Sequence, residues 1–196
     1  MPVHVQAMRV TERERSDKPR TSFCVALGGT ITSLVLLLMF LSTAFPILDY
    51  AIPTYAGFLI VVVIVEASAG WAFVTYCASA ILCPLLTPDF EATLLFILFM
   101  GYYPILYVFL MRISNKLLRG VLKFTVFNAA VLAYAAMFRF IFTSVDLMEG
   151  MESFGKWAAP SLLAMANLFF VIYDRVLGML IDKYISWFRK KVLKRK

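Results

Sequence analysis

Runs of about 20 apolar residues recur along this chain of 196 residues, and they constrain its fold more than any other feature. A helix of that length crosses the hydrocarbon core of a bilayer, so the runs predict transmembrane helices. The composition agrees, because 62% of the residues are hydrophobic and only 16% are charged, against about a quarter in a soluble domain. The sequence therefore predicts an all-α integral membrane bundle without a separate soluble domain.

Six transmembrane helices are expected, joined by short connections that place sequence neighbours side by side. The connection between the second and third helices, "EASAGWA", is short enough to predict a tight helical hairpin. The bundle covers residues 23–182, between a flexible polar tail at residues 1–22 and a basic tail at residues 183–196. The expected helices span residues 23–45, 52–70, 71–87, 90–112, 120–143 and 157–180.

Positive charge is concentrated on one side of the expected membrane. All but two of the 19 Lys and Arg residues lie in the N-terminal tail, near the connection between the fourth and fifth helices, or near the C-terminus. The two exceptions are Arg139 and Lys156. Since Lys and Arg accumulate on the cytoplasmic side, both termini are expected in the cytoplasm. The net charge of +7 is thus attributed to topology and to contact with the lipid bilayer, and no nucleic-acid partner is expected.

Motifs for common catalytic chemistry are missing from the sequence. It contains no GxxxxGK[ST] phosphate loop, no HExxH zinc motif and no serine nucleophile elbow. Its one histidine, His4, lies in the N-terminal tail, and Cys24, Cys77 and Cys83 lie in apolar runs without paired spacing. We therefore expect a protein that is not an enzyme and that has no metal site and no cofactor.

Ionisable residues near the cytoplasmic ends of the helices need partners, because a charge inside a bilayer costs about a few kcal/mol. Glu66 of the second helix can pair with Arg175 of the sixth. Alternatively, Asp174 can pair with Lys123, whose long side chain can also reach the headgroups. These charges can instead form a surface that meets another membrane subunit.

Three further polar side chains lie within the fifth and sixth helices. Arg139 is about one helical turn below the outer end of the fifth helix, where it can pair with Glu91 or hold an anionic ligand. Asn128 and Asn167 lie near mid-depth, so both are expected to face the interior of the bundle. They can join two helices by hydrogen bonds or form the wall of a polar cavity.

The stretch "FMGYYPI" interrupts the fourth helix. Pro104 cannot donate a hydrogen bond to the carbonyl of Met100, so the helix is expected to kink there, with Gly101 easing the bend. The freed carbonyl must face protein or water. Tyr102 and Tyr103 point about 100° apart, so only one of them can lie fully on a given cavity wall. The alternative is a bend filled by packing.

Small residues form a stripe on the first helix. Cys24, Gly28 and Thr32 are four residues apart, and Gly29 and Ser33 lie beside them. Such a stripe lets two helix backbones approach closely, either inside the bundle or at a contact with another subunit.

Taken together, these features resemble the S components of energy-coupling factor (ECF) transporters. The resemblance covers about residues 22–182 and rests on the six-helix topology, the small-residue segment "CVALGGTITS" and the segment "FMGYYPI". It implies a bacterial cell-membrane protein that captures a vitamin-like micronutrient from outside. It also implies partners, namely a membrane-embedded T component and two ATPases, which would explain why this chain has no nucleotide-binding motif.

The resemblance also implies positions for two sites. In the family, an Ala-x-x-x-Ala motif contacts the T component; Ala26 and Thr30 occupy those positions here, and Gly28 and Gly29 keep that surface small. The substrate site of the family lies in the outer half, under a gating loop between the first two helices. In this chain the loop includes Asp49 and Tyr50, and the expected binding residues are Arg139, Glu91, Asn167, Tyr102, Tyr103, Tyr55 and Trp157.

Two other functions remain open. The chain can be a non-transporting scaffold of the bacterial envelope that binds partners through its first helix and basic tail. A polar cavity in the outer half would count against a scaffold, whereas solid packing there would favour it. The chain can also be a small secondary transporter, although its halves show no inverted repeat.

Overall fold

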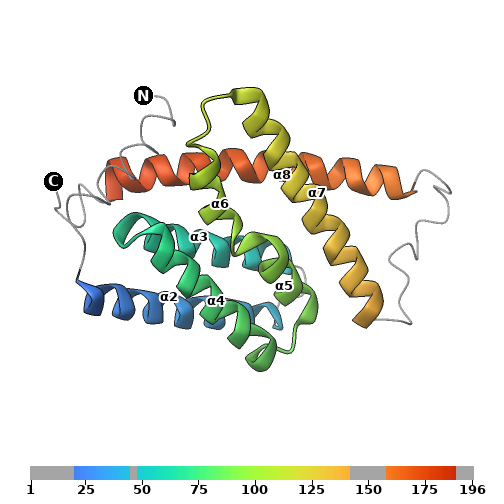
Figure 1. Ribbon diagram of the computed structural model, residues 1–196. Coiled ribbons are helices and arrows are strands. Elements are labelled where there is room, and N and C mark those ends of the chain that lie inside the picture. Colours follow the sequence, from blue (N-terminus) through green and yellow to red (C-terminus); the bar gives the residue numbers. More distant parts are fainter. Residues whose placement is uncertain (1–19, 45–47, 142–157, 189–196) are drawn as a thin grey trace.

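The computed structural model describes residues 20–44, 48–141 and 158–188, and within these ranges the chain is all-helical without strands (Figure 1). The predicted tails fall largely outside these ranges. The helices are α2 (Thr21–Ser42), α3 (Ala51–Glu66), α4 (Ala69–Leu86), α5 (Phe90–Leu95), the π-helix η2 (Phe96–Met100), α6 (Tyr103–Leu110), α7 (Lys116–Ile141), α8 (Ala158–Lys183) and the π-helix η4 (Tyr184–Phe188).

The predicted helical class is confirmed, and every predicted span contains helix at nearly the predicted residues. Five stretches of the described chain are long and apolar enough to cross a membrane, with α5, η2 and α6 together forming one of them. The sixth, α3, has 16 residues and spans only about 24 Å at about 1.5 Å per residue. The second predicted span is therefore shorter at its end than expected, because the chain turns after Glu66.

The two ends of the bundle differ in charge, and we name them accordingly. The acidic end holds Asp49, Asp89 and Glu91, and the basic end holds Arg112, Lys116 and Lys183.

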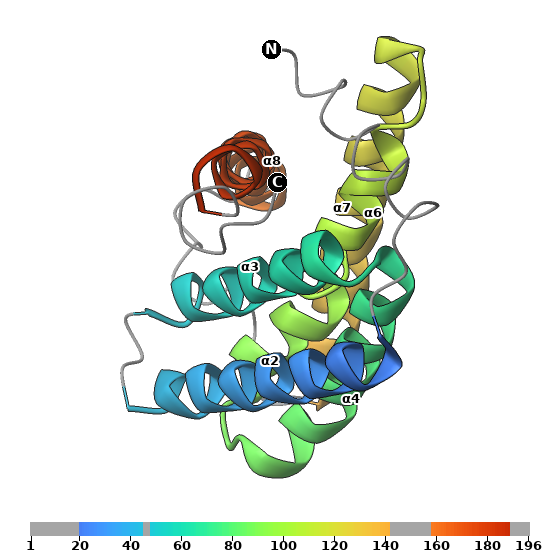
Figure 2. The ribbon, with the colours of Figure 1, turned by 90° about the vertical axis from the view of Figure 1, so that its left-hand side faces the viewer.

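The short helix α3 lies at the centre of the bundle. It packs against α2, α4, α6 and η2, and most of its residues are buried. Its sequence, "AIPTYAGFLIVVVIVE", is apolar on nearly all sides, as a helix surrounded by other helices requires. Its side chains contribute to two hydrophobic clusters, one shared with α2 and α4 and the other with η2, α6, α7 and α8. Figure 2 shows α8 nearly along its axis, on the opposite side of α3 from α2.

The predicted hairpin between the second and third spans is confirmed. Only Ala67 and Ser68 separate α3 from α4. Ser68 caps α4, because its hydroxyl accepts a hydrogen bond from the backbone N–H of Trp71 at 3.4 Å. The turn thus satisfies one of the first N–H groups of α4 and keeps the two helices adjacent.

The predicted break in the fourth span is also confirmed. The helix widens into η2, passes through a turn at Gly101 and Tyr102, and resumes as α6 with Pro104 in its first turn. The hydroxyl of Tyr76, on α4, donates to the carbonyl of Ile97 at 2.7 Å. A wide turn leaves carbonyl groups without their regular helical donors, and the Tyr76 hydroxyl is a donor for one of these carbonyls.

The carbonyl of Met100, which Pro104 leaves without its helical donor, faces α3. A Cβ atom added to Gly57 would lie 2.3 Å from this carbonyl oxygen and 3.4 Å from the hydroxyl oxygen of Tyr173. Real Cβ atoms do not approach an oxygen so closely, so only glycine fits at residue 57. The close contact between α3 and η2 therefore depends on glycine at residue 57.

We predict that Gly57→Ala destabilises the protein by about 1–3 kcal/mol, because the new methyl group must push η2 away from α3. Gly29→Ala in α2 is the matched control, since a Cβ there would have no atom within 4 Å. That control should be neutral or stabilising by up to about 1 kcal/mol, as alanine favours helix. Thermal unfolding in detergent measures both variants. Equal effects would contradict the close approach at Gly57.

Candidate functional site

A cavity of about 500 Å³ lies in the half of the bundle toward the acidic end. Its wall is formed by α5, η2, α7 and α8, together with Tyr50, the residue that precedes α3. The lining residues are Tyr50, Leu95, Leu98, Phe99, Met100, Phe127, Ala130, Val131, Tyr134, Leu162, Met165, Ala166 and Phe169. We call this cavity the Tyr50 pocket.

Helical spacing explains how α7 forms one wall of this pocket. Phe127, Val131 and Tyr134 recur every three or four residues, so their side chains point to the same side of the helix. Lys123, one turn earlier, continues this face toward the basic end and is 7% exposed. The face therefore carries an apolar wall next to the Tyr50 pocket and a charge farther along the helix.

Aromatic rings close the pocket toward the centre of the bundle. Phe127 stacks on Phe170 with ring centroids 4.5 Å apart, and Phe99 meets Phe127 edge-on at 5.1 Å. Phe99 and Phe170 are buried, with 3% and 2% of their surface exposed. These rings separate the Tyr50 pocket from the ionic groups that lie farther toward the basic end.

The lining is chemically simple. Its described residues include no charged one, and their side-chain oxygen atoms are the phenol oxygens of Tyr50 and Tyr134. Apolar walls with a few polar groups are typical of small-molecule sites, in which burial supplies affinity and the polar groups set orientation. The pocket suits an apolar body that carries one or two hydrogen-bonding groups.

Carboxylates surround the acidic end of the pocket. Asp89 caps α5 by accepting a hydrogen bond from the N–H of Ala92 at 3.1 Å, and its other oxygen accepts one from the hydroxyl of Ser42. Glu91 lies one turn before the lining residue Leu95, on the same side of α5. Asp49 immediately precedes Tyr50. Asp89 thus has a structural role, whereas Glu91 and Asp49 adjoin lining residues.

The pKa values of residues in the connection between α2 and α3 reflect these neighbouring carboxylates. Partial burial, followed by the charge of Asp89, raises the pKa of the Asp49 carboxyl above its ordinary value. Burial, followed by the charges of Glu91 and Asp49, raises the pKa of the Tyr50 phenol. The Oδ1 atom of Asp49 is buried and has no hydrogen-bond partner among the described residues. The acidic end is therefore unfavourable for further negative charge.

An ion pair lies on the other side of the aromatic rings. The ammonium of Lys123 donates to both carboxylate oxygens of Asp174, at 2.6 and 2.9 Å. The phenol of Tyr103 donates to the same carboxylate at 2.6 Å, and the ammonium also lies 4.2 Å from the ring centroid of Tyr107. The predicted pairing of Asp174 with Lys123 is confirmed.

The alternative ion pair does not form. Within the described part of the chain no ion pair joins Glu66 to Arg175, although Glu66 is buried at the end of α3. The Lys123–Asp174 pair therefore links α7 to α8, and Tyr103 adds α6 to the same network.

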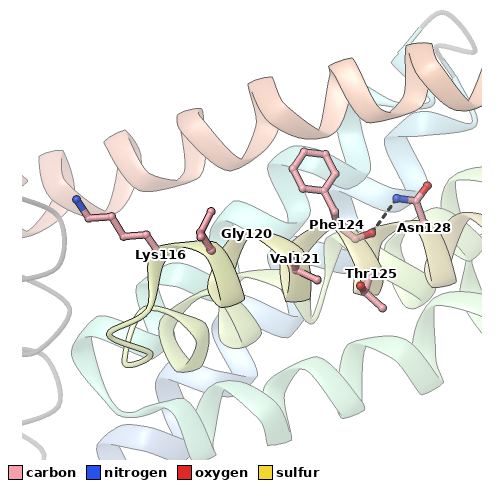
Figure 3. A pocket seen from close by; sticks show the side chains of 7 residues that line it. Lys116, Gly120, Val121, Phe124, Thr125 and Asn128 are labelled. Atoms are coloured by element: carbon pink, nitrogen blue, oxygen red, sulfur yellow. Dashed lines mark hydrogen bonds between the residues drawn. The ribbon is translucent and has the colours of Figure 1, made fainter.

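Asn128 and Asn167 bond to each other across α7 and α8. Each amide nitrogen donates to the other's side-chain oxygen at 3.1 Å. Each also donates to a backbone carbonyl of its own helix, Phe124 or Leu163, at 2.8 Å; Figure 3 shows the first of these bonds. This confirms the interpretation that the two amides join the helices, and it places Asn167 in a helix contact outside the lining of the Tyr50 pocket.

Arg139 does not take part in the pocket. Its side chain is exposed, it forms no ion pair with Glu91, and it lies roughly 140° around α7 from Tyr134. The pairing of Arg139 with Glu91 that the sequence left open is therefore not observed.

The other expected binding residues are dispersed. Tyr103 is fully buried in the ionic network, and Tyr102 contacts the rings of Tyr76 and Phe99. Tyr55 is 61% exposed on α3. Trp157 lies outside the described residues. Of the expected substrate-site and gating-loop residues that the structure describes, Tyr50 is the one that lines the pocket.

The small residues of α2 face two directions. Cys24 and Thr32 are buried, and a Cβ on Gly28 would lie 2.8 Å from the hydroxyl oxygen of Thr75, so this stripe packs against α4 inside the bundle. Gly29 and Thr30 are exposed instead. Ala26 is also exposed, and its carbonyl accepts the hydroxyl of Thr30 at 2.9 Å. The expected T-component contact is therefore divided, with Gly28 inside and the other three residues on the surface.

Several lining residues gave no signal in the sequence. Tyr134, Phe127 and Phe169 lie in stretches of α7 and α8 in which most residues are apolar, so pocket and packing residues have a similar composition. The spacing of Tyr134 from Lys123 indicates that both face inward. It does not indicate that space remains between the helices.

A second hollow, of about 580 Å³, runs along α7 toward the basic end (Figure 3). All of its lining residues, including Lys116, Gly120 and Asn128, belong to α7. It is a groove on one helix, without a second wall from another described element, so it is a weaker candidate site than the Tyr50 pocket.

Comparisons with known proteins give no match to this chain among protein-family models, curated proteins or solved structures. Among the described residues, no group of three His, Cys, Asp or Glu side chains could hold a metal ion.

We predict that Asp174→Asn and Lys123→Met each destabilise the protein by about 3–5 kcal/mol, because each leaves a charged side chain that is only 9% or 21% exposed without its counter-charge. The double variant Lys123→Met/Asp174→Leu should recover much of that loss, since it removes both charges. Unfolding free energies in mixed micelles measure the stability of the three variants. Single variants that are no less stable than the double variant would show that the pair contributes nothing.

Asp49→Asn should raise thermal stability modestly at pH 7. The pKa of Asp49 is raised in the folded protein. Ionisation of this carboxyl therefore opposes folding at pH values above 3.8, the ordinary pKa of the group. That cost disappears as the pH falls through the raised pKa and below 3.8. The gain in Tm from Asp49→Asn should therefore shrink as the pH approaches 4. A gain that does not change with pH would assign the effect to something other than charge.

Proposed function

We propose that this chain is the substrate-capture (S) subunit of an ECF-type importer and that the Tyr50 pocket is its substrate site. The observation that carries the proposal is the position of the pocket. It lies in the half of the bundle that adjoins the connection between α2 and α3, and Tyr50 from that connection is part of its wall. The resemblance to S components implies a site in this place, under this loop.

The direction of loading follows from the positive-inside rule. Arg112, Lys116 and Arg119 adjoin the turn between α6 and α7, at the basic end of the bundle. If the basic end faces the cytoplasm, the Tyr50 pocket lies in the outer half and receives substrate from outside the bacterial cell membrane.

The exposed face of α2 supports the proposed partners. Gly29 and Thr30 leave a shallow surface, and the hydroxyl groups of Thr30 and Ser33 are satisfied by carbonyls of the same helix. Such a surface allows close helix contact without unpaired polar groups. We assign this surface to binding of the T component. The two ATPases would supply the energy for transport, because this chain has no nucleotide-binding motif.

The same face supports an alternative, a membrane scaffold that binds envelope proteins through α2. The Tyr50 pocket argues against solid packing in that half of the bundle, but its walls are apolar rather than polar. The two functions therefore differ in one respect that can be tested, because a capture subunit needs the pocket and a scaffold does not.

Association tests the partners. The chain, expressed with the T component and ATPases of the same bacterium, should co-purify with them. Thr30→Trp should weaken that association, because it places a large ring on the exposed face of α2, whereas Leu132→Trp, at an exposed position on α7, should not. If no complex forms with the unaltered chain, the importer assignment is wrong.

Occupation of the pocket tests capture itself. Ala130→Phe should fill the Tyr50 pocket and abolish both uptake and any small molecule that co-purifies, as detected by mass spectrometry. Ala129→Phe is the matched control, because Ala129 is the adjacent residue on α7 and is exposed. Equal uptake by the two variants would exclude the Tyr50 pocket as the substrate site.

A further inference from the structure

The composition of the Tyr50 pocket restricts the kind of molecule that it can bind. The 13 described residues that line it include no charged side chain. A charged ligand group inside this lining would lose its hydration without gaining a counter-charge. The part of the ligand that enters the pocket must therefore be uncharged.

The acidic end opposes negative charge beyond the lining as well. Glu91 lies one turn before Leu95 on α5, and Asp49 adjoins Tyr50. Both carboxylates are therefore next to lining residues on two different elements. An anionic group on a ligand bound at that end of the pocket would lie near them.

Arg139 cannot compensate for these carboxylates. It is the one Lys or Arg in the described residues near the acidic end, but its side chain is exposed and lies roughly 140° around α7 from Tyr134. The direction of Arg139 on α7 therefore does not support the hypothesis, drawn from the sequence, that Arg139 holds a carboxylate.

The groups that remain in the pocket define a complementary ligand. Phe99, Phe127 and Phe169 offer ring surfaces, while Tyr50 and Tyr134 add two phenol oxygens near the acidic end. Rings of a ligand can stack on such surfaces, and its hydroxyl, amide or carbonyl groups can bond to a phenol.

We propose that the Tyr50 pocket takes an uncharged, ring-containing molecule and discriminates against anions. This inference rests on the proposed capture function and names its substrate class. The ring system lies between η2, α7 and α8. One or two neutral polar groups lie near Tyr50 and Tyr134, where Glu91 and Asp49 disfavour a carboxylate or phosphate.

Three probes with the same ring body test the proposal, namely 2-naphthalenemethanol, 2-naphthylmethylammonium and 2-naphthoate. Equilibrium dialysis measures their binding to the full chain in nanodiscs of zwitterionic lipid. Empty discs and discs with Ala130→Phe measure the uptake of each probe by lipid. The uncharged alcohol should bind most tightly, and the anion at least about tenfold more weakly.

Charge variants identify the source of the discrimination. Asp49→Asn/Glu91→Gln should strengthen binding of 2-naphthoate several-fold and leave 2-naphthalenemethanol nearly unchanged. Arg139→Ala should change neither probe, because this side chain faces away from Tyr134. Loss of 2-naphthoate binding in Arg139→Ala would overturn the proposal.

Other outcomes separate this inference from the proposed function. If the anion or the cation binds most tightly, and Ala130→Phe blocks that binding, the proposed ligand class is wrong and the capture function stands. If no probe shows binding that Ala130→Phe blocks, both the ligand class and the capture function are wrong. Tightest binding by the alcohol, without association with the T component, would support the ligand class and reject the importer.

Discussion

The contact between the carbonyl of Met100 and Gly57 organises this bundle. Pro104 removes the donor that this carbonyl would have in a regular helix, and a hydrocarbon environment offers no replacement. The carbonyl instead lies against α3, at a residue with no side chain. Because α3 is held close to η2 in this way, it can contribute to the hydrophobic clusters on both sides, and the broken fourth span becomes the partition between them.

Two polar contacts join α7 to α8, Tyr103 connects one of them to α6, and the Tyr50 pocket lies between the two helices beyond these contacts. Toward the basic end the Lys123–Asp174 pair and Tyr103 fix the helices, and the Asn128–Asn167 pair fixes them nearer the middle. Beyond the amide pair, toward the acidic end, the facing residues are apolar and do not fill the space. The pocket is therefore positioned by polar contacts that lie outside its own lining.

Features governed by local covalent chemistry or by the cost of unpaired charge could be predicted from the sequence. The break at Pro104 follows from its missing N–H, and the Lys123–Asp174 pair follows from two opposite charges at similar depth. The direction of a side chain could not be predicted in the same way, because hydropathy indicates depth and not rotation about a helix. A ligand role for Arg139 was thus considered from its depth and its guanidinium group, whereas Phe127 and Tyr134 were overlooked because most residues of that span are also apolar.

The shortness of α3 has a consequence for how binding must be measured. A 16-residue helix covers about 24 Å, about 6 Å less than a typical hydrocarbon core, so at least one of its ends, at Tyr50 or Glu66, stops within the membrane. Neighbouring helices surround α3, so the lipid cannot simply thin to match it. If the end at Tyr50 is the recessed one, an apolar ligand dissolves in the lipid before it meets the protein. Its apparent dissociation constant then scales with the amount of lipid present, and affinities are comparable only at a fixed lipid-to-protein ratio.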